Sequence, residues 1–452
     1  MSAGAPAAAA GEPRPTLTVL DACAMIVGIV IGAGIFKAPS IVAASVSSEQ
    51  VFILLWIAGG VVSLVGALCY AELGSAYPNA GGEYFFLSRA FGGRLGFLFA
   101  WARMSVVQTG AIAAIAFVFG DYASQLLSLG EKSPAIYAAL VVIAVTALNI
   151  AGTRQSKRLQ NALTVALAGA ILAVIVFGLA SPGAAAAAAP PTASSAPLFS
   201  QLALIFILLT YGGWNEAAYL TAEIRDARRN IVRALVLGIL IVTALYVLLN
   251  LAYLNVLGLD GMKASKAVAA DLMKATLGDA GAVVLSLVVI AASVSTLNAT
   301  VFTGARTNYA VGRDYSLFRL LGVWREETNT PVNALLLQGA VALVLVLLAS
   351  MTPDGFETMV AYTAPAFWLF FLLTAISLFV LRRQVPVNAE HFRVPWYPLT
   401  PLLFCAMCGY MLYSSVNYAL SKDPSSLGAQ LGIGVLVLGV PLAMKAGKEI
   451  TS

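Results

Sequence analysis

The sequence predicts an all-α polytopic membrane protein with twelve transmembrane helices. Of its 452 residues, 60% are hydrophobic and only 10% are charged, whereas soluble domains have roughly 25% charged residues. Apolar stretches of about 20 residues, the length of a spanning helix, recur along the whole chain. Glycines also interrupt two of these stretches at corresponding places in the two halves of the chain, which favours broken helices within an inverted repeat.

Polar turns divide the apolar sequence into the expected spans. These cover residues 20–43, 51–77, 92–126, 135–152, 159–181, 199–224, 231–257, 280–311, 332–351, 356–381, 396–419 and 427–444. Residues 1–19 lack the basic region and apolar core of a signal peptide, so we expect a disordered tail that is not cleaved. Residues 445–452 form a second expected tail. The Pro-interrupted, low-complexity segment 182–198 is expected to be an external linker between the two halves.

The basic residues predict the orientation in the membrane. With a cytoplasmic N-terminus, one side of the membrane holds most of them: Arg154, Lys157, Arg158, Arg225, Arg228, Arg229, Arg233, Arg313, Arg319, Arg325, Arg382, Arg383 and Arg393. The positive-inside rule then places both termini in the cytoplasm, with the protein in the inner (plasma) membrane of the cell. The net charge of +5 is therefore a topology signal and does not indicate nucleic-acid binding.

The two interrupted spans are the strongest functional signal. The glycines lie in the segments 28–36 and 211–215. Glycine readily leaves helical geometry, and the backbone groups that it frees must face protein or a water-filled cavity, because lipid offers them no hydrogen bonds. Gly32 and Gly34 could instead serve close helix packing. The second interruption at the matching position favours a binding site.

Four ordered segments carry a resemblance to a known family. They are GIVIGAGIF at 28–36, YAELGSAYPNAGGEYFFLSRAFG at 70–92, YGGWNEAAYLTAEIRDARRNI at 211–231 and STLNATVFTGARTNYAVGRD at 295–314. The chain resembles the amino acid, polyamine and organocation transporter superfamily, and the third segment is most similar to its L-type amino acid transporter branch. The resemblance implies alternating access and the LeuT-like fold. In that fold, residues 20–181 and 199–381 form a five-plus-five inverted repeat with helices 1 and 6 broken, and residues 396–444 are peripheral.

A zwitterionic amino acid fits these breaks. The backbone N–H groups after Gly32, on Ala33 and Gly34, are oriented to bind its carboxylate. Carbonyl groups at the ends of the half-helices can accept from its ammonium group. The predicted substrate-binding residues are Ile29, Val30, Gly32, Ala33, Gly34, Leu209, Thr210, Gly212, Gly213 and Asn215.

Side chains near the breaks suggest the substrate. Relatives that take cationic substrates have an acidic residue where this chain has Asn215, which favours neutral amino acids. Glu216 is either functional or turned away from the site. Leu209 replaces the phenylalanine gate of many L-type relatives. We interpret Glu72 and Arg103 as members of structural networks near the cytoplasmic side.

The coupling ion is left open by the sequence. The lysine that acts as a built-in cation in some relatives is replaced by Leu167. Sodium symporters of the same fold use two adjacent hydroxyls that match Ser295 and Thr296, and a hard cation prefers such oxygen ligands. The predicted sodium ligands are Gly28, Ile31, Ala292, Ser295 and Thr296. Sodium-independent exchange and proton coupling are the alternatives, and no other cofactor is expected.

Other classes and partners are less favoured. The sequence has no intramembrane His, Cys or carboxylate constellation of an enzyme and no repeated polar rings of a channel. A transport-dead amino acid sensor remains an alternative. Cysteines occur at positions 23, 69, 405 and 408 alone, in apolar stretches. With no cysteine from residue 70 to 404, no disulfide-linked heavy chain is implied.

Overall fold

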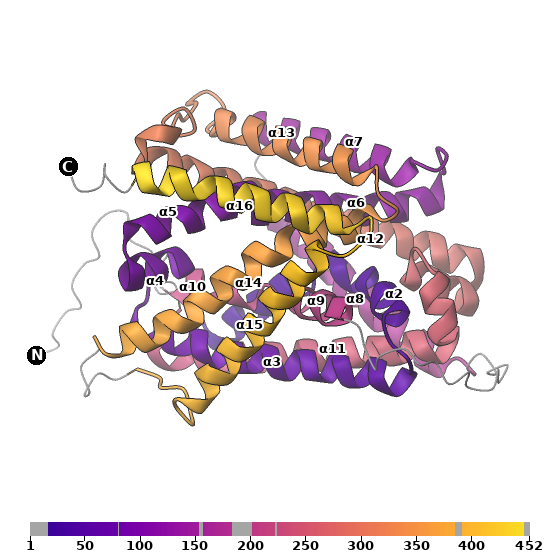
Figure 1. Ribbon diagram of the computed structural model, residues 1–452. Helices are drawn as coiled ribbons and strands as arrows, with labels where there is room; N and C mark the ends of the chain where they lie inside the picture. Colours follow the sequence, from indigo (N-terminus) through magenta and orange to yellow (C-terminus); the bar gives the residue numbers. More distant parts are fainter. Residues whose placement is uncertain are drawn as a thin grey trace, which may run out of the picture.

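The computed structural model describes residues 17–79, 81–152, 157–182, 201–221, 224–384 and 391–446, and these residues form helices with no strand among them. Within this described part, nine helices are long and apolar enough to cross a membrane, and two shorter apolar helices accompany them. Figure 1 shows the helices gathered in one elongated bundle. The predicted all-α polytopic fold is confirmed.

The first half of the chain supplies five expected spans. Their elements are α1 (Val19–Val30), η1 (Ala33–Phe36) and α2 (Ala38–Ala44); α3 (Glu49–Ala76); α5 (Gly93–Ala102), η2 (Arg103–Val107) and α6 (Gln108–Leu126); α7 (Ser133–Ile150); and α8 (Lys157–Ala180). The short helix α4 (Gly82–Phe91) precedes the third span. The expected linker 182–198 lies outside the described residues, apart from residue 182.

The second half begins with another broken helix. Its elements are α9 (Gln201–Thr210), η3 (Trp214–Glu216) and α10 (Ala217–Leu220); α11 (Ala227–Ala264); α12 (Val268–Asp314); η5 (Ser316–Phe318); α13 (Val332–Ala349); α14 (Gly355–Arg382); α15 (Leu399–Ala419); and α16 (Ser426–Ala446). Of the expected tails, residues 1–16 and 447–452 lie outside the described residues.

The start of α1 is fixed by a capping box. Thr18 accepts from the backbone N–H of Asp21 through Oγ1 at 3.2 Å, and the Asp21 carboxylate accepts from the Thr18 backbone N–H at 3.0 Å. This reciprocal arrangement satisfies N–H groups that a helix leaves unpaired at its start. Leu17, just before the cap, pairs with Ile224 in an isolated bridge. The first broken helix therefore begins in contact with the segment that follows the second.

Two segments between expected spans are more helical than the sequence predicted. α11 and α12 extend beyond the expected spans 231–257 and 280–311 through kinks at Gly258 and Gly278, where φ is +63° and +72°. Glycine adopts these angles without a side-chain clash, so each helix can change direction there. The first turns of α12, from Val268 to Met273, bury an apolar face, which explains why this segment folds as a helix.

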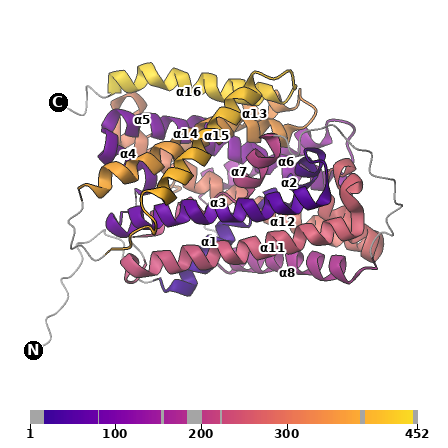
Figure 2. The same cartoon turned by 60° about the horizontal axis from the view of Figure 1, so that its bottom comes forward.

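The packing places the broken helices inside the bundle. α3 and α11 pack along each other, and both views show them side by side. α1 packs on α11, α9 packs on α3, and α14 packs between α6 on one side and α15 and α16 on the other. In Figure 2, α8 and α11 lie at the edge of the bundle opposite α16. The interruptions between α1 and η1 and between α9 and η3 are therefore enclosed by α3, α6, α11 and α14.

Candidate functional site

The two helix breaks touch each other. Gly32 is extended after α1, with φ −100° and ψ −178°, and Gly213 has φ +108° just before η3. A Cβ atom added to Gly213 would lie 3.1 Å from Ile29 Cγ2 and 3.2 Å from the Ile29 carbonyl oxygen. One added to Gly34 would lie 3.8 Å from Thr210 Oγ1. The chain segments that were predicted to bind substrate thus meet, and Gly213 allows their closest approach.

A tyrosine that the sequence analysis did not identify connects the breaks. The hydroxyl of Tyr246, on α11, lies 2.9 Å from the Val30 carbonyl oxygen and 3.3 Å from the Thr210 carbonyl oxygen, and donates to both. Its ring is fully buried and packs edge-on against Trp56 and Tyr211. A carbonyl oxygen has two lone pairs. That of Val30 also accepts from the Gly32 backbone N–H at 2.7 Å, so of these two carbonyl groups it is the one of Thr210 that retains capacity for a substrate ammonium group.

A cavity of about 120 Å³ adjoins the second break. One water needs roughly 10–15 Å³ of such space, so a small organic side chain fits. The cavity is lined by Glu83, Phe99, Arg103, Val107, Gly213, Asn215, Glu216, Ala366, Phe367, Phe370 and Phe371. Two of the predicted substrate-binding residues, Gly213 and Asn215, are among them. The other eight, which are Ile29, Val30, Gly32, Ala33, Gly34, Leu209, Thr210 and Gly212, do not line it. The binding role of all ten residues stays a prediction.

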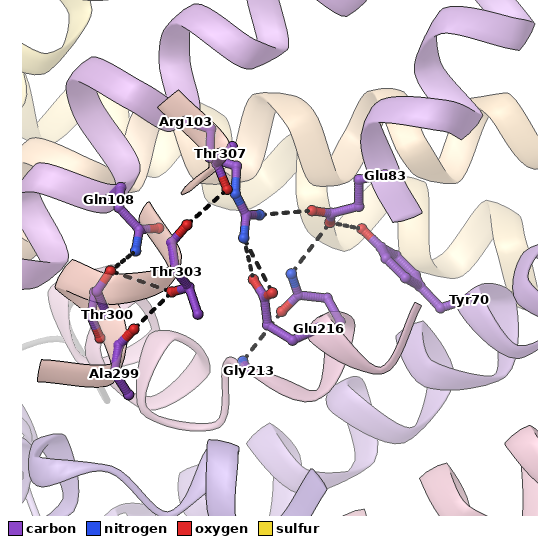
Figure 3. A network of polar contacts seen from close by, with 11 residues as sticks. Tyr70, Glu83, Arg103, Gln108, Gly213, Glu216, Ala299, Thr300, Thr303 and Thr307 are labelled. Atoms are coloured by element: carbon purple, nitrogen blue, oxygen red, sulfur yellow. Dashed lines mark hydrogen bonds and ion pairs between the residues drawn. The ribbon is translucent and has the colours of Figure 1, made fainter. Parts of the chain in front are cut away.

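A polar network forms one wall of this cavity. Arg103 donates through Nη2 to both carboxylate oxygens of Glu216, at 3.1 and 3.2 Å, and its Nη1 lies 3.9 Å from Glu83 Oε2. Glu83 Oε1 accepts from the Tyr70 hydroxyl at 2.6 Å and from Asn215 Nδ2 at 3.3 Å. Figure 3 shows the guanidinium between the two carboxylates, with Tyr70 beyond Glu83.

The structure settles where two ionisable residues point. Arg103 belongs to a network, as expected, and its side chain also lines the cavity. Glu216 faces the cavity instead of turning away. Arg103 begins η2, a π-helical turn, and such single turns occur frequently at functional sites. Glu83 was not considered in the sequence analysis. The sequence signal for Glu83 was an ionisable residue beside a long apolar span, which is a candidate functional residue.

Aromatic rings form another part of the cavity wall. The ring centroids of Phe367 and Phe371 lie 4.2 Å apart, and Phe371 stacks on Trp214 at 5.5 Å. Phe367 also lies 3.6 Å from the position that a Cβ atom would take on Gly212. The aromatic side chain beside the second break therefore comes from α14, whereas position 209 holds leucine.

Glu72 has the structural role that the sequence predicted. It is buried on α3, accepts from the Val394 backbone N–H at 2.6 Å, and lies 3.3 Å from Arg382 Nε at the end of α14. These contacts join α3, α14 and the segment before α15. Glu72 does not line the cavity.

The predicted sodium ligands lie on α12 and on the end of α1. Ala292, Ser295 and Thr296 lie on α12, which packs against η1, whereas Gly28 lies in α1 and Ile31 is the residue that ends it. Ala292 and Ser295 are buried. Leu167, at the position where some relatives have lysine, is also buried. The donor set is one of carbonyl and hydroxyl oxygens, as a hard cation prefers, and it stays a prediction.

A second ionic cluster lies beyond the first break. Lys37 follows η1 and is only 3% exposed. Its ammonium nitrogen lies 2.9 Å from Asp121 Oδ2 on α6 and 3.0 Å from Asp354 Oδ2, which caps the start of α14. We call these residues the Lys37 triad. Charged residues within apolar stretches were the sequence signal for Lys37 and Asp121.

Comparison with known proteins agrees with the motifs. The family model for amino acid permeases matches residues 17–436. The b(0,+)-type amino acid transporter 1 of Mus musculus is 32% identical over 372 residues, which is 80% of this chain and 75% of that protein. The large neutral amino acids transporter small subunit 2 of Homo sapiens is 30% identical over 443 residues, which is 95% of this chain and 80% of that protein. This confirms the resemblance, and the chain belongs to the amino acid permease family of multi-pass membrane transporters.

Proposed function

We propose that this chain carries neutral L-amino acids across the inner membrane of the cell by alternating access, with both termini in the cytoplasm. The observation that supports it most directly is the contact between the two breaks beside a cavity with a largely apolar wall. Asn215 supplies a neutral side chain where a cationic substrate would need an acidic one. One relative is named for large neutral amino acids, in agreement with this substrate class.

The proposed binding mode uses the backbone for the common part of every amino acid. The first N–H groups of a helix have no partner inside it, so those of Ala33 and Gly34 are suited to the substrate carboxylate. The carbonyl oxygens of Ile29 and Leu209 would accept from the ammonium group. The side chain would then enter the cavity past Gly213, where apolar contact with aromatic rings contributes about 25 cal/mol per Å² of buried surface.

The proposed coupling ion is sodium. The carbonyl groups of Gly28, Ile31 and Ala292, with the hydroxyls of Ser295 and Thr296, would hold it. When bound there, a cation would join α12 to the first break and so couple ion binding to the shape of the substrate site. Sodium-independent exchange and proton coupling are the competing outcomes of the test.

The test uses the purified chain alone in proteoliposomes. We expect accumulation of neutral amino acids, faster with an inward sodium gradient than with choline at the same pH, and no accumulation of lysine, arginine or glutamate. Uptake that does not depend on sodium would rule out sodium as the coupling ion, but would leave the proposal of amino acid transport intact. Thermal stabilisation by leucine without any uptake or counterflow would identify a sensor. Active protein in the absence of any second chain would show that no heavy chain is needed for transport.

A further inference from the structure

The cavity beside the second break contains three charges in otherwise apolar surroundings. Glu83, Arg103 and Glu216 all line it, and the remaining wall is mainly aromatic and aliphatic. Two carboxylates and one guanidinium leave a single excess negative charge. Burying an unpaired charge in such surroundings is costly, so the pairing of these three groups decides which ligand side chains the cavity tolerates.

The two carboxylates are not equivalent. Glu83 is buried, and its Oε1 already accepts from the Tyr70 hydroxyl and Asn215 Nδ2. Both of these donors come from the protein itself, so Glu83 is hydrogen-bonded without help from a ligand. The Glu216 side chain is 35% exposed and accepts from Arg103 through both oxygens. Arg103 and Glu216 are thus the pair whose separation would present a charge to the cavity.

We propose that the Arg103–Glu216 pair determines the charge of the substrate side chain. The inference rests on the proposed function, since it assumes that the side chain of an amino acid enters this cavity. While paired, the two groups offer a neutral side chain no unbalanced charge. Either group alone would favour a side chain of opposite charge, because its own hydrogen-bonding capacity would otherwise be left unsatisfied. The pair acts by excluding charged substrates, which is a common way to obtain specificity.

Substitutions at Arg103 and at Glu216 should change the preferred charge of the substrate side chain in opposite directions. Arg103→Gln leaves Glu216 without its guanidinium and should make arginine a competitor of leucine uptake. Glu216→Gln removes one of the two carboxylates beside Arg103, whose Nη1 still lies 3.9 Å from Glu83 Oε2; the Nη2 donors that Glu216 occupied should then make glutamate a competitor. The double variant has the same net cavity charge as the wild type and should again reject both. Each single change should alter the relevant inhibition constant about tenfold or more, as expected for a hydrogen bond to a charged group.

The experiment measures radiolabelled leucine uptake in proteoliposomes against unlabelled arginine and glutamate, for the wild type and the three variants. Thermal shifts of the solubilised proteins with the same three amino acids give a readout that needs no transport. Opposite changes in the two single variants, with recovery in the double variant, support the inference. If a single variant does not fold, the charge swap Arg103→Glu with Glu216→Arg must still select leucine.

The unfavourable outcomes separate the two proposals. Wild-type protein that neither binds nor carries leucine would refute the proposed function. Suppose that the wild type takes up leucine, but the ratio of the inhibition constants for arginine and glutamate is the same in both single variants. That result would overturn the charge-selection role alone. An equal loss of leucine uptake in both, with no new competitor, would also overturn it and assign the pair a structural role.

Discussion

Replacing Lys37 with methionine should destabilise the protein through the carboxylates that it leaves behind. Methionine keeps most of the side-chain length, so packing changes little, but the ammonium that lies within 3.0 Å of Asp121 and Asp354 is lost. The Asp121 side chain is 10% exposed and that of Asp354 is 29% exposed. Water can therefore solvate Asp354 in part, and the main cost falls on Asp121.

The expected magnitude follows from this difference in burial. Removing one partner of a buried ion pair costs roughly 3–5 kcal/mol, and the partial exposure of Asp354 puts the expected loss near the lower end, about 3 kcal/mol. Replacing Asp121 with asparagine as well removes the uncompensated charge. The double variant should then lose about 1 kcal/mol, the net value of ordinary hydrogen bonds. The two substitutions should therefore be strongly non-additive.

The assay is unfolding by SDS in mixed micelles, followed by tryptophan fluorescence. Lys274→Met is the matched control, because Lys274 pairs with Asp279 on the surface with both side chains largely exposed, and such pairs contribute little. A Lys37→Met variant as stable as Lys274→Met, or a double variant less stable than Lys37→Met, would refute the argument that the Lys37 triad joins η1, α6 and α14.

Three further predictions concern the breaks and the coupling ion. Tyr246→Phe removes the hydroxyl that joins both breaks and should weaken leucine binding about 5- to 150-fold, from roughly 1–3 kcal/mol of lost hydrogen bonding. An unchanged binding constant in calorimetry would contradict this. Gly213→Ala should lower thermal stability because φ is +108° there and a side chain is strained. Gly32→Ala should keep stability and reduce uptake, because its Cβ position meets only the Val30 carbonyl oxygen, at an ordinary contact distance of 3.9 Å. The opposite pattern in paired melting and uptake measurements would rule out this assignment. The double substitution Ser295→Ala with Thr296→Ala should raise the sodium concentration for half-maximal uptake far more than it raises the KM for substrate at saturating sodium. Equal changes in these two quantities would show that the two hydroxyls are not sodium ligands.

The sequence predicted the spans and breaks because these depend on local properties. Apolar length sets the spans, and glycine marks the places where helices 1 and 6 are interrupted. The motif segments also identified Asn215 and Gly213, which the structure places in the cavity wall. Helices α4 and the first turns of α12 were not predicted, because a short helix outside the apolar spans gives a weak periodic signal.

The side-chain partners could not be predicted because they come from distant segments. The Tyr246 hydroxyl meets carbonyl groups of residues 30 and 210, and nothing in the local sequence around it indicates this. Lys37 and Asp121 were visible as charges in apolar stretches, but their pairing depends on how η1 packs against α6. The sequence identified Glu216 as an unusual residue. The direction of its side chain could not be predicted, because it depends on where Arg103 lies.

The span formed by α5, η2 and α6 connects the two ionic clusters along one helix. Arg103 and Asp121 lie on it roughly 18 residues apart, or about 27 Å at 1.5 Å per residue. Arg103, within the span, binds Glu216 of the second break, and Asp121, near its C-terminal end, binds Lys37 after the first. The span therefore acts as a strut between the breaks. A shift of the strut along its axis must either separate one of these ion pairs or carry both broken helices with it, so the segments that follow the two breaks are mechanically linked.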